Sequence, residues 1–296
     1  MKTLPAGLAA MLATGVTTRC NCWRIERADG QVFGFTDHDR QLSFDGVDYE
    51  PATALSASET AASLGLAVDT LEAAGALSSD AINEDELARK LWDNASVTQI
   101  VVDWSDTANR VVTFAGSIGE VERGPLAFRA ELRSLSHALN QRTGRIFGSL
   151  CDADLGDARC AVNLALAAFS AAGTASAAVS RWAFRTTGLA AFETGWFKAG
   201  KLTWTSGANA GAVIEIKRHV DAGATHLVEL AEEMPFDIGV GDAFAITAGC
   251  DKTVETCKAK FDNVVNFRGF PSMPGNDWVT SYPNREDGND GGGLGD

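Results

Sequence analysis

The sequence has little cysteine, no long apolar run, and fewer basic than acidic residues. Six cysteines among 296 residues are far too sparse for a secreted disulfide scaffold. No apolar run reaches the roughly 20 residues that cross a bilayer, so we expect no transmembrane segment. Lys and Arg number 25 against 39 Asp and Glu, a net charge of −14. This excess of acidic residues argues against a surface that binds nucleic-acid phosphates, and we expect no direct contact with nucleic acid.

Short, regularly spaced strand patterns dominate what is present. Turn residues at hairpin spacing, such as Ala28-Asp29-Gly30 and Asp45-Gly46, separate β-rich runs near the N-terminus. A second β-rich region begins near Ala191, where Gly207 to Gly211 separate two strands. No alternation of strands and helices is visible. The pattern therefore predicts a mainly β protein with two or more small antiparallel barrel or sandwich domains and a few short helices.

Two polar segments contain cysteine pairs and divide the chain. We expect an N-terminal β-rich domain, two cysteine segments that bracket an inserted small β domain, and a flexible tail. Their boundaries are 1–148 for the first domain, 149–170 and 249–275 for the cysteine segments, 171–248 for the insertion and 276–296 for the tail. The tail is rich in Gly, Asp and Asn and cannot bury apolar surface.

The six cysteines fall into two groups. Cys20 and Cys22 lie two apart in an expected strand with apolar neighbours, which favours an ordinary buried role. The other four are Cys151, Cys160, Cys250 and Cys257. They lie beside charged and small residues on two expected loops, a pattern suited to a tetrahedral zinc site or an iron–sulfur cluster. Two local disulfides, 151–160 and 250–257, are the other alternative.

The spacing of the cysteines and the charges near them help to choose between a cluster, a zinc site and disulfides. The cysteines are separated by eight and by six residues, wider than the two to four usual in zinc knuckles, which favours a cluster. Five basic residues flank the four cysteines, and cations stabilise the net negative charge of a thiolate-ligated cluster. These residues are Arg145, Arg159, Lys252, Lys258 and Lys260.

Catalytic motifs are weak. His38 lies between Asp37 and Asp39, but no nucleophile motif accompanies it, and a polar hairpin is the simpler interpretation. The remaining histidines are scattered, and no dinucleotide or phosphate-loop fingerprint occurs. We therefore expect a protein that is not an enzyme. A small iron–sulfur or zinc-dependent redox enzyme is the alternative function.

The two cysteine pairs, together with "FDNVVNFRGFPSMPG" after the second and "CWRIERADGQVFGFTDHDRQLSFDGVDYEP" near the N-terminus, resemble one known family. The sequence is similar to tail-tip hub proteins of long-tailed phages and gene transfer agents, relatives of the siphophage tail-tip L protein. The resemblance implies a virion structural protein at the tail tip, or baseplate, assembled in the host cytoplasm. It also implies that Cys151, Cys160, Cys250 and Cys257 ligate a structural [4Fe–4S] cluster, with zinc as the alternative.

The same resemblance implies partners. A homotrimeric hub would join the distal tail protein ring to a central fibre protein of the megatron type. A tail-associated peptidase is a further partner in this setting. The insertion between Cys160 and Cys250 is longer than the resemblance to the siphophage protein implies, so we expect the second β domain to be specific to the gene-transfer-agent branch.

Overall fold

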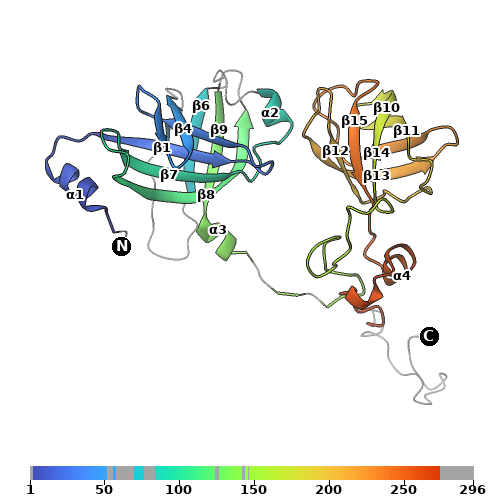
Figure 1. Cartoon of the computed structure of the whole chain (residues 1–296). Coiled ribbons are helices and arrows are strands. Elements are labelled where there is room, and N and C mark those ends of the chain that lie inside the picture. Colours follow the sequence, from blue (N-terminus) through green and yellow to red (C-terminus); the bar gives the residue numbers. More distant parts are fainter. Residues whose placement is uncertain are drawn as a thin grey trace, which may run out of the picture. The chain divides into compact units, whose positions relative to one another are not determined.

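The computed structural model describes residues 3–51, 56–57, 70–76, 84–123, 127–141, 144–145 and 147–273. The chain forms two compact units, residues 1–142 and 143–296. Each unit has its own β-structure (Figure 1). The predicted flexible tail, 276–296, lies outside the described residues.

The first unit is built on one mixed sheet with the strand order β3-β4-β2-β1-β7-β8-β9-β6-β5. All neighbouring pairs are antiparallel except β2 and β4, which are parallel. The strands are β1 (Arg19–Glu26), β2 (Val32–Thr36), β3 (Leu42–Phe44), β4 (Val47–Pro51), β5 (Ser56–Ala57), β6 (Thr70–Ala76), β7 (Ser96–Asp103), β8 (Arg110–Arg123) and β9 (Ala127–Ser134). Both predicted hairpin turns are present. Between β3 and β4, Asp45 and Gly46 have positive φ angles of 53° and 72°, as a type I′ turn requires.

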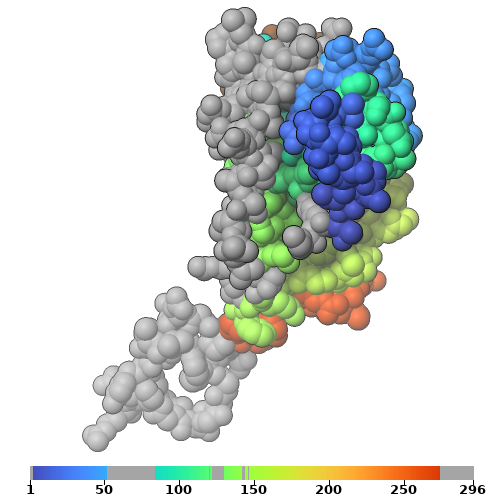
Figure 2. Space-filling view, turned by 90° about the vertical axis from the view of Figure 1, so that its left-hand side faces the viewer, coloured from blue at the N-terminus to red at the C-terminus, as the bar shows by residue number. Residues whose placement is uncertain are grey.

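Among the described residues of this unit, three short helices accompany the sheet: α1 (Ala6–Ala13), α2 (Glu84–Ala88) and α3 (Leu135–Leu139). The α1 helix buries Leu8 completely, and Gly7 lies so close to Asn109 that a side chain would collide with its amide. Figure 2 shows α1 in dark blue on the surface, beside blue and green parts of the same unit. The main core of the unit combines aliphatic and aromatic side chains, among them Trp23 and Trp92.

The second unit contains a closed antiparallel barrel with the strand order β10-β11-β14-β13-β12-β15. Its strands are β10 (Ser170–Ser180), β11 (Ala183–Thr187), β12 (Lys201–Trp204), β13 (Val213–Asp221), β14 (His226–Leu230) and β15 (Ala243–Thr247). Phe184, Trp204 and Phe244 fill its interior, with ring centroids 5.1 to 5.9 Å apart. The prediction of a mainly β protein that includes a barrel is confirmed. The strands β10 and β11 were not anticipated, because Ala, Ser and Gly dominate β10 and give it little strand-like character.

The barrel begins and ends at the same place. In the pairing of β10 with β15, Ser170 lies opposite Thr247, so the segments before β10 and after β15 emerge side by side. The second of these segments contains α4 (Val254–Phe261) and the 3-10 helix η1 (Val264–Asn266). The loop predicted around Cys257 is wrong, because Cys257 lies on α4. The Thr253 side chain caps α4, and Asp262 ends it in a left-handed conformation.

Candidate functional site

The four cysteines selected from the sequence line one pocket in the second unit. Cys151 and Cys160 precede β10, Cys250 follows β15, and Cys257 lies on α4. The paired ends of the barrel bring these distant segments together. All six cysteines lie among the described residues and are free, so the two local disulfides are not formed in this structure. The pocket is completed mainly by the apolar side chains of Ala153, Leu155, Val162, Phe261 and Phe267.

The first cysteine segment is folded around Asp157. Its carboxylate accepts hydrogen bonds from three backbone N–H groups, those of Cys160 at 2.6 Å, Arg159 at 2.9 Å and Asp154 at 3.1 Å. The bond from Cys160 is the largest cause that holds the pKa of Asp157 below its usual value. A short polar loop is thereby given a fixed turn that presents Cys160 to the pocket.

Asp152 tethers the same segment to its surroundings. Its carboxylate accepts from Arg145 Nε at 2.9 Å and from Arg159 Nη1 at 3.1 Å. The hydrogen bond from Arg145 is the main reason that the pKa of Asp152 is lowered. Arg145 also donates to the carbonyl oxygen of Arg268 at 2.9 Å, which joins the two cysteine segments. Two of the predicted flanking cations therefore serve as structural tethers.

Lys252 connects the two halves of the pocket through its backbone. Its N–H donates to Cys250 Sγ at 3.4 Å, and its carbonyl oxygen accepts from the N–H of Cys151 at 2.8 Å. Its ammonium group donates to the carbonyl oxygen of Ala153. One residue thus contacts a cysteine of each segment, Cys250 at its thiol and Cys151 at its backbone N–H.

The helix that presents Cys257 is positioned by its own N-terminus. Asp251 accepts from the backbone N–H and hydroxyl of Thr253 and from the hydroxyl of Thr256. The hydroxyl of Thr253 in turn accepts from the N–H of Thr256 at 3.3 Å. This cap starts α4 in a register that buries Cys257, whose exposed fraction is 8 %.

The pocket disfavours bare thiolates. Burial raises the pKa of Cys250 and of Cys257, and for Cys257 the other three thiols of the pocket raise it further. Four deprotonated cysteines here need compensating positive charge. A cation or a metal cluster among them would supply it, since coordination stabilises the thiolate form.

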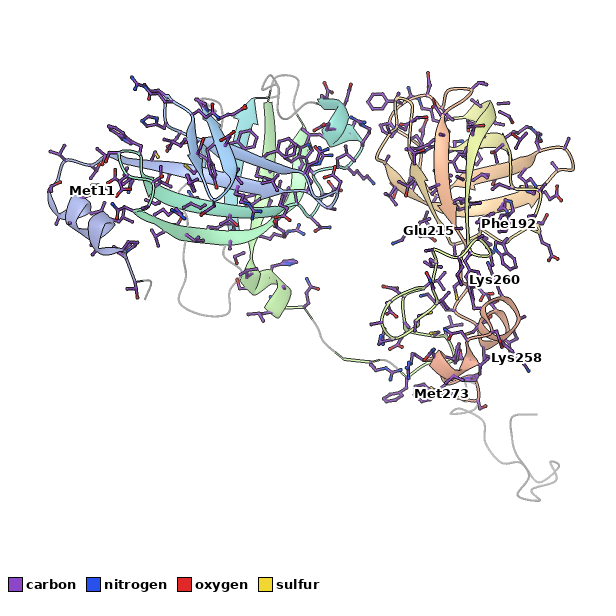
Figure 3. The ribbon with its side chains drawn as sticks, in the orientation of Figure 1. Met11, Phe192, Glu215, Lys258, Lys260 and Met273 are labelled. Atoms are coloured by element: carbon purple, nitrogen blue, oxygen red, sulfur yellow. The ribbon has the colours of Figure 1, made fainter. Side chains whose placement is uncertain are left out.

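Lys260 is a half-buried cation on α4. Its ammonium group donates to the carbonyl oxygens of Gly249, at 2.7 Å, and of Trp196. Figure 3 shows Lys260 where α4 meets the base of the barrel, whereas Lys258 points away from it. Burial lowers the pKa of Lys260 to about 8. Of these two predicted flanking cations, Lys260 joins α4 to the barrel, whereas Lys258 is exposed.

The thiols share a pocket without converging on a single ion. No group of three or more His, Cys, Asp or Glu side chains in the described part of the chain is arranged to hold one metal ion. With Zn–S bonds of about 2.3 Å, a tetrahedral zinc site draws its sulfurs to within about 3.8 Å of one another.

The other sequence candidates lie in the first unit and do not join this site. Cys20 and Cys22 are buried in β1, where their thiols lie 3.6 Å from the Val102 carbonyl oxygen and 3.5 Å from the Thr36 hydroxyl. This matches the expected core role. His38 Nδ1 accepts the backbone N–H of Arg40 at 3.0 Å, as in a polar turn.

Sequence reasoning missed two polar features of the second unit. One is a buried histidine pair inside the barrel, His219 and His226, with Nε2 and Nδ1 3.1 Å apart. Their seven-residue separation across a hairpin was the available signal. The other is Asn263, which lies in the "FDNVVNFRGFP" motif and contacts both cysteine segments.

Comparisons with known proteins assign the family. Residues 5–163 match the family model described as baseplate hub protein, N-terminal attachment domain. A chain of the solved structure entitled "Virion of native gene transfer agent (GTA) particle" is 44% identical, with a TM-score of 0.87. The match covers 98% of this chain and 100% of that one. The chain belongs to the baseplate hub protein family. This confirms the family expected from the sequence, and the structural role of that family agrees with the expectation that the hub protein is not an enzyme.

A second family model, phage conserved hypothetical protein BR0599, matches residues 195–277 of the hub protein. A search of curated proteins found no match. Cys151 and Cys160 lie in the region matched by the first model, and Cys250 and Cys257 in that matched by the second. The pocket is therefore assembled from both matched regions. In the described part of the hub protein, no helix has the length and apolar character to cross a membrane.

Proposed function

We propose that the hub protein is a structural part of the tail tip of a gene transfer agent or a related phage-like tail. Its family and its 44% identity to a chain of a gene transfer agent virion, over nearly the full length of both, support this role. Within the tip, Cys151, Cys160, Cys250 and Cys257 bind one [4Fe–4S] cluster.

The single observation that carries the cluster is the shared pocket. Four cysteines from segments about 90 residues apart line it, although nothing in their local sequence requires them to meet. Iron–sulfur clusters are held by four cysteine thiolates, and N–H groups directed at the sulfurs stabilise them. The N–H of Lys252 lies in such a position at Cys250. The residues present therefore fit the group.

The proposed role of the site is mechanical. When bound, the cluster supplies iron–thiolate bonds that cross-link the segment before β10 to the segment after β15. By the chain-entropy model, a cross-link that closes a loop of about 100 residues stabilises the folded state by about 4–5 kcal/mol. Metal binding at a site that is absent from the unfolded chain also contributes directly to folding. The cluster would thus hold the base of the barrel closed.

The partners follow from the same proposal. A homotrimer of the hub protein would join the distal tail protein ring to the central fibre protein, with a tail-associated peptidase nearby. Membership of the baseplate hub family supports a position among other tail proteins. Light scattering of the purified protein tests the trimer. Electron cryomicroscopy of intact particles tests the location, and density for this chain outside the tail tip would overturn the proposal.

Metal and sulfide analysis tests the cluster directly. Protein purified without oxygen should be brown, absorb broadly near ~400 nm, and contain about four irons and four sulfides per chain. One zinc per chain without colour would refute the cluster but leave the hub role intact. A colourless protein without bound metal would remove the cofactor altogether.

A further inference from the structure

Asn263 contacts both cysteine segments at once. Its backbone N–H donates to the carbonyl oxygen of Cys257 at 3.1 Å. Its side-chain Nδ2 donates to the carbonyl oxygen of Cys160 at 2.5 Å and lies 3.7 Å from Cys160 Sγ. The backbone of a cysteine from after the barrel and both the backbone and the thiol of one from before it are therefore contacted by a single residue.

The side-chain amide of Asn263 is itself oriented. Asn266 Nδ2 donates to Asn263 Oδ1 at 2.7 Å. Because the amide oxygen is occupied by this donor, the NH₂ group is directed to the carbonyl oxygen and sulfur of Cys160. The hydrogen bonds thus define which side of the Asn263 amide carries the oxygen and which carries the nitrogen.

The chain reaches this position through the end of α4. Asp262, in a left-handed conformation with φ of 46°, ends the helix, and its N–H donates to the Lys258 carbonyl oxygen at 3.2 Å. The reversal turns Asn263 back over the last turn of the helix, where it meets the Cys257 carbonyl oxygen. Asn263 is half-buried, which protects its hydrogen bonds from water.

We propose that Asn263 is a positioning residue for the cluster ligand Cys160, and that its amide donates to the Cys160 sulfur and tunes the bound group. The inference rests on the proposed function, because it concerns the same site. An N–H directed at a ligand sulfur withdraws charge from it and raises the reduction potential of the cluster, and outer-shell partners of this kind also set how firmly a metal is retained. The role accounts for two asparagines of the "FDNVVNFRGFP" motif.

The test compares the same substitution at two asparagines of the full chain, purified without oxygen. Asn263→Asp keeps the size of the side chain but removes the donor. Asn163→Asp is the matched control, because Asn163 is exposed and uses only its Oδ1, which accepts from the Ala165 N–H, a role that Asp retains. The measurements are the midpoint potential of the cluster and the rate at which a chelator removes iron.

We expect Asn263→Asp to shift the midpoint potential to more negative values and to release iron roughly tenfold faster. Asn163→Asp should match the wild type in both. If Asn263→Asp takes up no iron, Asn266→Ala decides, since it leaves Asn263 in place but removes the donor to its Oδ1. A negative shift in Asn266→Ala supports the proposal, and an unchanged potential overturns it.

The experiment also distinguishes failure of the proposed role of Asn263 from failure of the proposed cluster. Asn263→Asp with wild-type potential and wild-type iron release would overturn the role of Asn263 while leaving the four-cysteine ligation intact. Wild-type protein that contains neither iron nor sulfide would instead overturn the proposed cluster, independently of any variant, and would leave the hub role intact.

Discussion

The ammonium group of Lys260 lies 4.7 Å from the ring centroid of Trp196 and donates to the carbonyl oxygen of the same residue. Trp196 belongs to the segment between β11 and β12, and its indole N–H donates to the Ala168 carbonyl oxygen at 3.2 Å. Lys260 is on α4. The helix that presents Cys257 is therefore fixed to the barrel through contacts that do not involve the thiols. A bound cluster would add further cross-links to this existing contact between α4 and the barrel.

Lys260→Met is expected to destabilise the second unit. The substitution keeps the aliphatic stem but removes the donor to the carbonyl oxygen of buried Gly249. It also removes one of the two donors to the Trp196 carbonyl oxygen, which still accepts from the N–H of Gly249 at 3.2 Å. An unsatisfied buried acceptor costs about 1–3 kcal/mol, so thermal unfolding of this unit should occur at a clearly lower temperature. Lys258→Met, on the exposed side of the same helix, is the control and should melt like the wild type. Equal melting of the two variants would show that Lys260 has no structural role.

Cys257→Ser is expected to abolish cluster binding. A hydroxyl in place of this buried thiol cannot supply the thiolate that the site requires. Iron content should fall to background, and limited proteolysis should cut within 249–273 while the first unit keeps its wild-type pattern. Cys20→Ala, in β1, should retain iron in full. A brown Cys257→Ser protein with intact digestion resistance would remove Cys257 from the ligand set.

Gly249→Ala is expected to disturb the pocket from the barrel side. A methyl group at Gly249 would lie 1.7 Å from the Lys198 carbonyl oxygen and 2.5 Å from the Gly200 nitrogen, both backbone atoms that cannot yield without moving the strand. Because Cys250 is the next residue, we expect lower stability together with reduced iron content. Gly148→Ala is the matched control, since nothing lies within 4 Å of the added methyl. Wild-type melting and iron content in Gly249→Ala would contradict the close approach.

Local features of the fold could be predicted from the sequence, and long-range ones could not. The Asp45-Gly46 turn was foreseen because the turn type demands these residues at that position. The helix around Cys257 was missed, although Thr253 is a favourable cap residue, because polar composition was taken as a sign of a loop. The strand β10 was missed because its small residues have weak strand propensity.

The candidate site shows the same division. Cys151, Cys160, Cys250 and Cys257 could be selected because polar neighbours are unusual for buried cysteines, and the structure places all four around one pocket. What brings them together is the pairing of β10 with β15, a contact between residues far apart in the chain that no local pattern encodes. The hydrogen bonds of Asn263 depend on that closure and could not be predicted from the sequence.

The last prediction concerns the histidine pair inside the barrel. The rings of His219 and His226 stack with centroids 5.1 Å apart, and the ring of Phe197 packs edge-on against His219. Burial, followed by the adjacent His226, lowers the pKa of His219 to about 4, whereas Asp221 works in the opposite direction. Lys260 also lowers it. His219 therefore stays neutral in the folded barrel at neutral pH.

The sign of the pH effect follows from that shift. In the unfolded chain His219 has its ordinary pKa of about 6.5, so between about pH 6.5 and 4 the unfolded state binds a proton that the folded state does not. The stabilisation that comes from a neutral His219 is fully present above about pH 6.5. It is lost as the pH falls towards 4, by about 3 kcal/mol at most.

Urea unfolding at a series of pH values, followed by the amide NMR signals of β13 and β14, measures this loss of stability. His219→Gln, which does not titrate, should flatten the pH dependence over this window, whereas His137→Gln in the first unit should leave it unchanged. Identical slopes in His219→Gln and the wild type would show that carboxylates, not the buried histidine, set the acid sensitivity of the barrel.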